Sequence, residues 1–194
     1  SQKMPAQNGT EARLQELLGD SLMARGQHEA AEQAFSAALE RRHAEQRLPR
    51  AVLQRKVADS LRARMVTAQA ETAVIQALET LGTLAPDWPA AWQHAWLDSQ
   101  LSLMSILYLR GDYLGLAGMT EAVQPMLASI GTAAHRIDYL SSLAELAVRR
   151  EHFTLSDATV ALCEALLAAA QEAEDPARMA LARFGVGFGL LWAD

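Results

Sequence analysis

The feature that most constrains the fold of this chain is an internal repeat near its start. The stretch from Gly19 to Glu40 aligns without a gap on the stretch from Ala58 to Glu79. The identical pairs are Asp20/Asp59, Ser21/Ser60, Leu22/Leu61, Ala24/Ala63, Arg25/Arg64, Ala31/Ala70, Glu32/Glu71, Ala34/Ala73, Ala38/Ala77, Leu39/Leu78 and Glu40/Glu79. Such a set of identities indicates one structural unit present twice, and a unit of this size buries its apolar faces by stacking on a neighbour.

Each copy has the pattern of two short amphipathic helices joined by a tight turn, which in the first copy lies at Gly26. Apolar residues fall at helical spacing on both sides of that turn. They are Leu18, Leu22 and Met23 before it, and Ala31, Ala34, Phe35, Ala38 and Leu39 after it. Small residues such as Gly19 allow two helix axes to approach closely, and we expect Phe35 to fill the wedge between them.

The same periodicity along the rest of the chain predicts an all-α fold of about nine helices. We expect a disordered lead-in at 1–9 and one repeat domain over 10–194, with helix pairs at about 11–42, 50–82, 89–130 and 133–172 and a final unpaired helix at 177–193. Asp175 followed by Pro176 is a typical helix start, because aspartate caps the first turn and proline suits the first helical position.

The first repeat resembles the tetratricopeptide pattern, which is L-G-x-x-Y followed by A-x-x-x-F. The matching residues are Leu18, Gly19, Leu22, Gly26, Ala31, Phe35 and Ala38. Gln15 stands where the pattern has tryptophan, and the repeat distance is nearer forty residues than the usual ~34. The resemblance implies a right-handed α-solenoid of antiparallel helix pairs that works as a protein-binding module.

The second half carries a more specific resemblance. The phrases GDYLGLAGM, LAELAVRREHFTLSDATVALCEAL and DPARMALARFGVGFGLLWAD are similar to the C-terminal repeat region of large bacterial signalling proteins. Those proteins join a P-loop ATPase to a nucleotide cyclase or a DNA-binding output domain. The resemblance implies a sensor or scaffold region, without catalytic residues of its own, that contacts partners and the other domains of a longer parent chain.

No catalytic or cofactor motif is present, so we expect neither an enzyme nor a bound cofactor. The histidines show no i, i+4 pair, which argues against a metal site. The glycine-rich run from Phe184 to Gly189 lacks the preceding strand and the spacing of a dinucleotide fingerprint, so close helix packing is the favoured interpretation. The single cysteine, Cys163, lies in an apolar helical pattern and is expected to be a buried small hydrophobe.

The chain has neither a run of ~20 apolar residues nor a signal-peptide pattern. We therefore expect a cytoplasmic location with no membrane partner. The formal net charge of −6 and the lack of a nucleic-acid motif also argue against nucleic acid as a partner.

Basic residues are concentrated between Arg41 and Arg64, which we call the basic stretch, and its only acidic residues are Glu45 and Asp59. The basic residues are Arg41, Arg42, Arg47, Arg50, Arg55, Lys56, Arg62 and Arg64. Two interpretations stay open: a solvated helix face with compensating neighbours, or a docking surface for an acidic peptide or domain.

Trp88, Trp92 and Trp96 recur at every fourth position and therefore form one stripe of a helix. Packing inside or between repeats is the favoured interpretation of this stripe. The alternative is an exposed aromatic platform for a peptide.

Mapping the tetratricopeptide pattern onto the chain predicts a peptide-binding or protein-binding groove lined by the first helix of each pair. Its expected residues are Arg13, Glu16, Asp20, Arg55, Asp59, Arg62, Leu101, Tyr108 and Leu109. Six of these residues are charged, which would be rare in a packed interface, so we expect them to be solvated in an open groove. Because this set grades from charged to apolar, we expect a partner with acidic residues beside an apolar anchor.

The final helix is expected to lack a partner helix, which would leave Phe188, Leu191 and Trp192 on an apolar face. Such faces tend to be covered by another copy of the same chain. The alternative function is therefore a self-associating scaffold that forms a homodimer through this end.

Overall fold

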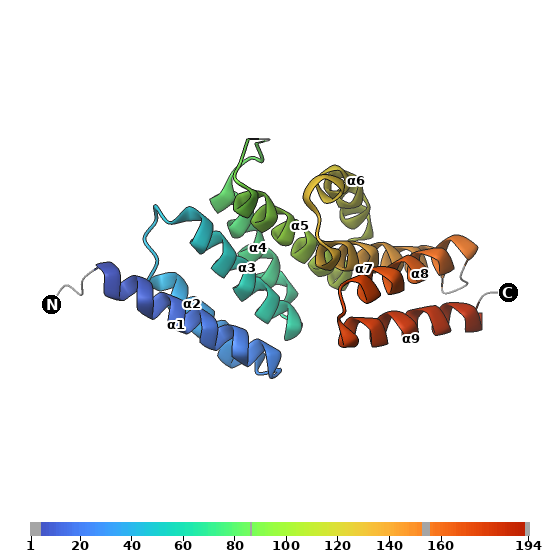
Figure 1. The fold of residues 1–194 in the computed structure, drawn as a ribbon, viewed down its shortest axis with the longest axis horizontal. Helices are drawn as coiled ribbons and strands as arrows, with labels where there is room; N and C mark the ends of the chain where they lie inside the picture. The colour runs from blue at the N-terminus through green and yellow to red at the C-terminus, as the bar shows by residue number, and fades with distance from the viewer. Residues whose placement is uncertain (1–4, 86, 153–155, 193–194) are drawn as a thin grey trace. The chain divides into compact units, whose positions relative to one another are not determined.

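The computed structural model describes residues 5–85, 87–152 and 156–192 of the 194-residue chain. Within these residues the fold is all-α, with nine helices and no strand (Figure 1). The helices are α1 (Pro5–Ala24), α2 (His28–Glu40), α3 (Arg47–Ala63), α4 (Thr67–Leu81), α5 (Ala90–Arg110), α6 (Tyr113–Ile130), α7 (Ala133–Arg150), α8 (Asp157–Glu172) and α9 (Pro176–Trp192). The all-α prediction is confirmed.

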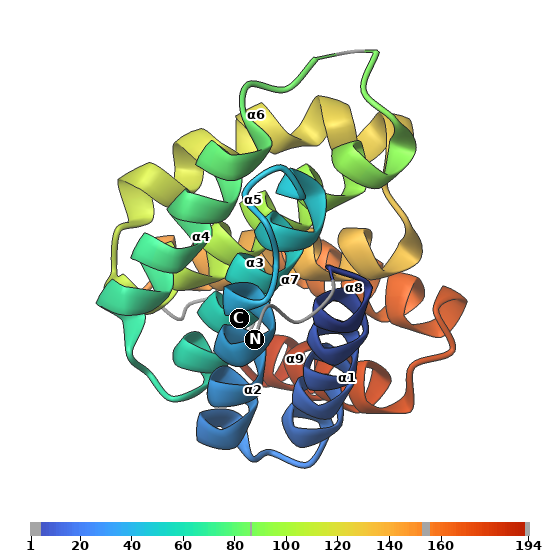
Figure 2. The same ribbon diagram turned by 90° about the vertical axis from the view of Figure 1, so that its left-hand side faces the viewer.

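The chain divides into two compact units, Ser1–Arg110 and Gly111–Asp194. In the first unit each helix packs on the next one along the chain, from α1 to α5, and α3 also contacts α5. Figure 2 shows α1 and α2 side by side. In the second unit α6 packs on α7, α7 on α8, and α8 on α9. Contacts of this kind, between neighbours in sequence, are typical of repeat proteins.

The two sequence repeats share one turn geometry. Gly26 and Met65 are equivalent positions of the repeat, and both have a positive φ, 72° and 62° respectively. In each turn the next amide donates a hydrogen bond of 2.9 Å back into the preceding helix, to the carbonyl of Leu22 or of Leu61. This arrangement is the Schellman motif that ends many helices. The repeat is therefore structural as well as sequential.

Phe35 fills the wedge between α1 and α2, as the sequence predicts. Its side chain is fully buried and packs with Ala31, Ala38 and Leu53, which brings α3 into the same core. A β-carbon added to Gly19 would overlap the Phe35 ring. The absence of a side chain at position 19 is therefore what allows α1 to approach α2 so closely.

The first helix begins earlier than the sequence predicts. We expected a disordered lead-in over 1–9, but residues 5–9 are helical and α1 begins at Pro5. Proline suits a helix start because it has no N–H to satisfy and its φ is already close to the helical value. Residues 1–4 of the expected lead-in lie outside the described residues.

The boundary between the two units falls inside the segment 89–130, which we expected to form one helix pair of a single domain. Gly111 ends α5 with a φ of 75°. Asp112 then caps α6, because its side chain accepts a hydrogen bond of 2.9 Å from the Gly115 amide. The chain thus turns sharply at the same place where its contacts divide.

The second unit has a small core and well-capped helices. Its core cluster joins α7, α8 and α9 through Ile137, Ala169, Ala170 and Ala182. Asp175 caps α9, since its carboxylate accepts hydrogen bonds of 3.0 Å from the amides of Ala177 and Arg178. The expected helix start at Asp175 and Pro176 is confirmed.

Candidate protein-interaction face

The residues expected to line a groove all lie on three helices of the first unit. Arg13, Glu16 and Asp20 lie on α1, Arg55, Asp59 and Arg62 on α3, and Leu101, Tyr108 and Leu109 on α5. We call the surface formed by these residues the first-helix face, because each of the three helices opens a repeat. Whether this face binds a partner stays a prediction.

Lys56 of α3 connects this face to α1. Its Nζ lies 2.9 Å from Oε1 of Glu16 and 2.7 Å from Oδ1 of Asp20. The same ammonium group lies 5.5 Å from the centre of the Phe35 ring. Sequence reasoning missed this role of Lys56, although the lysine lies within the basic stretch.

Glu16 is not solvated as we expected, because only 8% of the residue is exposed. Burial alone would raise the pKa of its carboxyl group. The hydrogen bonds and positive charges of Lys56 and Arg13 outweigh that effect, so its pKa lies below the ordinary value. Arg13 contributes through an ion pair of 2.9 Å within α1. Glu16 is therefore an ionised group at the joint between α1 and α3.

A second set of polar contacts connects α3 to α5. Arg55 lies 2.6 Å from the Asp59 carboxylate and 3.6 Å from that of Asp98 on α5. Ser102 of α5 donates a hydrogen bond of 2.7 Å to Asp59, and Arg62 lies 3.8 Å from the same carboxylate. Two sets of ion pairs and hydrogen bonds therefore connect α3 to its neighbours on this face, the Lys56 set to α1 and the Arg55 and Asp59 set to α5.

The apolar residues of the face are unequally accessible. Leu101 is only 3% exposed, so it belongs to the core and is not available to a partner. Tyr108 is half-buried, and Leu109 lies on the surface near the end of α5. An apolar anchor could therefore contact Tyr108 and Leu109 but not Leu101.

Elsewhere in the basic stretch, ion pairs connect neighbouring helices. Arg41, just after α2, lies 3.4 Å from Glu11 of α1. Arg64, just after α3, pairs with Glu29 and Glu32 of α2. Most charges in this stretch thus meet a partner within the first unit, which favours the interpretation of compensating neighbours over a wholly free docking surface.

Two other arginines of the stretch satisfy carbonyl groups where helices end. Arg47 donates hydrogen bonds of 2.8 and 2.9 Å to the carbonyls of Thr80 and Leu81 at the end of α4. Arg50 donates one of 2.9 Å to the carbonyl of Arg42, just after α2. Cations are favourable at these ends because the last carbonyls of a helix carry partial negative charge.

The three tryptophans pack on the core, as favoured from the sequence, but Trp88 precedes α5, so only Trp92 and Trp96 lie on that helix. Trp88, Trp92 and Trp96 lie against the buried cluster of Ala51, Ala77, Leu81 and Ala95. Trp88 and Trp92 meet edge to face at 5.5 Å between ring centres, and the Arg47 guanidinium lies 5.5 Å from the centre of Trp92. Arg47, Trp88 and Trp92 also line a pocket of about 550 Å³ beside the loop that follows α4.

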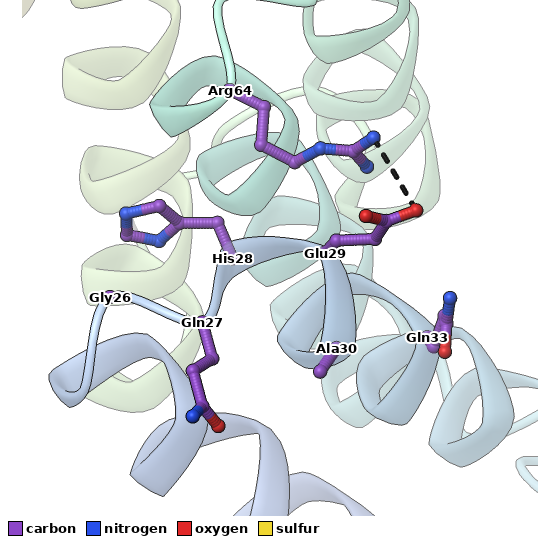
Figure 3. Close-up of a pocket in the computed structure, with 7 residues that line it drawn as sticks. All are labelled: Gly26, Gln27, His28, Glu29, Ala30, Gln33 and Arg64. Carbon is purple, nitrogen blue, oxygen red and sulfur yellow. Dashed lines mark ion pairs between the residues drawn. The ribbon is translucent and has the colours of Figure 1, made fainter.

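A second pocket of about 560 Å³ lies at the turn between α1 and α2 (Figure 3). Its lining residues are Gly26, Gln27, His28, Glu29, Ala30, Gln33 and Arg64. Figure 3 shows Arg64 facing Glu29, and these two charges pair at 3.8 Å. Because the cation and the carboxylate already neutralise one another, we assign no ligand to this pocket.

The final helix α9 carries exposed apolar residues. Leu181, Phe184 and Leu191 are all exposed. The side chains of Phe188 and Trp192, which we also expected on this face, lie outside the described residues. Within the glycine-rich run, a β-carbon at Gly185 would lie 3.9 Å from the sulfur of Cys163. One position of the run thus faces α8, where Cys163 is buried as predicted.

No group of three or more potential metal ligands occurs among the described residues. In that same part of the chain, no helix is long and apolar enough to cross a membrane.

Comparison with known proteins gives no identity. No model of a protein family matches the chain, and no curated protein matches it significantly.

Proposed function

We propose that the chain is a non-catalytic protein-interaction module of tetratricopeptide-like repeats. In this proposal it is the cytoplasmic sensor or scaffold region of a larger bacterial signal-transduction or transcription-regulating protein. Its helix pairs stack as a right-handed α-solenoid, and the first-helix face is its binding surface.

The observation that carries this proposal is that charged side chains connect α3 both to α1 and to α5. Lys56 connects α3 to Glu16 and Asp20 of α1, while Arg55 and Asp59 connect α3 to α5. Charged groups held between helices are poor core elements, because their burial is costly. They suit a face that stays hydrated until a polar partner covers it.

The partner proposed for this face is an acidic peptide or protein segment with an apolar anchor. Arg13 and Arg62 are the more exposed cations of the face, with 58% and 36% of their side chains accessible. Lys56 and Arg55 are less accessible, at 18% and 20%, and each of them pairs with two carboxylates. Arg13 and Arg62 would therefore attract the acidic residues, while Tyr108 and Leu109 would contact the anchor.

Site-specific photo-crosslinking tests this assignment. A benzoylphenylalanine residue replaces Arg13 or Arg62 in turn, and a third variant carries it at Gln76, an exposed residue of α4. We expect positions 13 and 62 to crosslink to one and the same protein in cells, and position 76 to give no such product. The proposal is wrong if no product forms at 13 and 62, or if position 76 captures the same protein equally well.

The alternative function is self-association through α9, and the exposed residues Leu181, Phe184 and Leu191 favour it. Apolar groups three or four positions apart lie on one side of a helix, so they form a surface that a second copy can cover. Sedimentation equilibrium of the wild type and of Leu181→Glu with Leu191→Glu tests it. A dimer that the two substitutions dissociate is expected, and a wild-type chain that stays monomeric at high concentration would exclude it.

A further inference from the structure

Three leucines of α1 are exposed on one side of the helix. Leu14 is 61% exposed, Leu17 47% and Leu18 49%. Positions i, i+3 and i+4 lie next to each other on a helix surface, so the three side chains form one apolar patch. We call this patch the α1 leucine face. It adjoins the first-helix face, because Leu17 lies four positions after Arg13.

The internal repeat shows what covers the same positions in the second repeat. The residues equivalent to Leu14, Leu17 and Leu18 are Leu53, Lys56 and Val57 of α3. Leu53 and Val57 pack on the α2 cluster built around Phe35, Ala31 and Ala38. The Lys56 ammonium group lies over the Phe35 ring, 5.5 Å from its centre. In this repeat, all three positions contact the second helix of the repeat before it.

The third repeat also covers these positions. Counted back from the turn at Gly111, as from those at Gly26 and Met65, the equivalent residues in α5 are Ser99, Ser102 and Leu103. Ser99 and Ser102 are buried, and Leu103 packs against the cluster that contains Ala70 and Val74 of α4. The three positions are therefore covered in two successive first helices. In α1 the same three positions are exposed.

Arg25, which follows α1, is likewise exposed where its equivalent in the second repeat is paired. Arg64 after α3 pairs with Glu29 and Glu32 of α2, the preceding second helix. Its repeat equivalent is Arg25, which is exposed and whose side chain makes no ion pair with the described residues. The first repeat therefore has an arginine, Arg25, at the position where Arg64 of the second repeat pairs with glutamates.

From these equivalences we infer that the α1 leucine face is a docking surface for an amphipathic helix with the α2 pattern. Such a helix carries a phenylalanine between alanines at helical spacing, as in Ala31, Phe35 and Ala38, and glutamates one and two turns earlier. The phenylalanine and alanines cover the leucines, and the glutamates pair with Arg25. This inference goes beyond the proposed function, because it concerns a different surface and a different kind of partner.

The occupant is a helix of another polypeptide segment rather than a second folded copy of this chain. The faces of α2 and α4 that carry this pattern are already covered by α3 and α5. A folded copy therefore has neither of these faces to offer.

The probe is a synthetic peptide with the sequence of residues 28–42, labelled with a fluorophore and stapled between positions 33 and 37 to keep it helical. The staple is needed because isolated helices of this length are marginal in water. Fluorescence anisotropy measures its binding to the full chain. The test variant is Leu14→Lys with Leu18→Lys, and the matched control is Ile75→Lys with Leu114→Lys, two exposed apolar residues outside α1 and α9.

We expect saturable binding to the wild type and the control, and at least about tenfold weaker binding to the test variant. Replacing the phenylalanine of the peptide by alanine, or Arg25→Glu in the chain, should weaken binding too. Because the substituted residues are exposed, the thermal midpoint of each variant should stay close to that of the wild type. No saturable binding up to about millimolar peptide, or equal binding to the test variant, would overturn the inference.

Sedimentation equilibrium of the chain alone completes the test. If the leucine face awaits a different helix, Leu14→Lys with Leu18→Lys should leave the sedimentation behaviour of the wild type unchanged. A wild-type dimer that Leu14→Lys with Leu18→Lys dissociates would show that a second copy covers this face, and the inference would then be wrong.

Discussion

The ring of Phe35 lies in the space that a β-carbon on Gly19 would occupy. This contact fixes how closely α1 approaches α2, and the ammonium group of Lys56 on α3 lies 5.5 Å from the centre of the same ring. One side chain of α2 therefore sets the spacing of the first three helices. The stability of the first unit should depend strongly on both members of this contact.

We predict that Gly19→Ala destabilises the chain by about 1 to 3 kcal/mol, because an added methyl group would force the Phe35 ring or α1 to move. Gly9→Ala is the matched control, since it makes the same change in the same helix at a place where a β-carbon meets nothing within 4 Å. The control should be neutral or gain up to about 1 kcal/mol from its better helix propensity. Urea unfolding measures both, and equal midpoints would refute the close contact.

Phe35→Ala should cost about 3 to 5 kcal/mol, as is typical when a buried phenylalanine is truncated. The same substitution should also relieve the crowding at position 19, so Gly19→Ala should cost less in the Phe35→Ala background than in the wild type. A double-mutant cycle from urea unfolding measures this coupling. Strictly additive effects would mean that the two residues do not share one space.

The two repeats differ in the residue that adopts the left-handed conformation in the turn, which is Gly26 in the first repeat and Met65 in the second. Met65 has a φ of 62° where the first repeat has Gly26, and a left-handed conformation costs a residue with a side chain roughly 1 to 2 kcal/mol. Part of that cost is offset because glycine loses more backbone entropy on folding. We therefore predict that Met65→Gly raises the free energy of unfolding by up to about 1 kcal/mol.

The reciprocal change, Gly26→Ala, should lower the free energy of unfolding by a similar amount, because the backbone there also has a positive φ. Differential scanning calorimetry of both variants gives the sign directly. A destabilised Met65→Gly variant would show that the Met65 side chain contributes more than its backbone strain costs.

We predict that the lowered pKa of Glu16 makes the stability of the folded chain sensitive to acid. The pKa of the Glu16 carboxyl group in the folded chain lies below the ordinary value of 4.5, so the unfolded chain binds the proton more readily than the folded chain does. The stability that the ionised carboxylate contributes is thus complete above pH 4.5 and is lost as the pH falls through the lower, folded-state pKa. Glu16→Gln should be less stable than the wild type near neutral pH, and the difference should shrink below pH 4.5.

Urea midpoints of the two proteins between pH 7 and pH 3 measure this difference. If the gap between wild type and Glu16→Gln stays constant over that range, Glu16 is not the ionised partner of Lys56 in the folded chain.

The local features of the fold could be predicted from the sequence because they depend on neighbours in the chain. Helical spacing located the helices, and the small residue at Gly19 together with the bulk of Phe35 predicted their wedge. Asp175 and Pro176 marked the start of α9 correctly for the same reason. The start of α1 at Pro5 could not be predicted from apolar spacing, because the segment around Pro5 is polar and has no such periodicity.

Contacts between long side chains could not be predicted in this way. The partners of Lys56 lie on another helix, and the repeat spacing does not fix how far a flexible ammonium group reaches. The same holds for Arg47, whose partners are backbone carbonyls at the end of α4. Glu16 was expected to be solvated because it is charged, and only the position of Lys56 shows why it can be buried.

The measurement that tests the proposed interaction face most directly is the dissociation constant of the crosslinked partner as a function of salt. The test variant is Arg13→Glu with Arg62→Glu, and the matched control is Arg150→Glu with Arg183→Glu, which reverses two exposed charges in the second unit. We predict that the test variant binds at least about tenfold more weakly at low salt and shows a flatter salt dependence, while the control binds like the wild type. Equal affinity of the test variant and the wild type at low and high salt would contradict the assignment of the first-helix face as the binding surface.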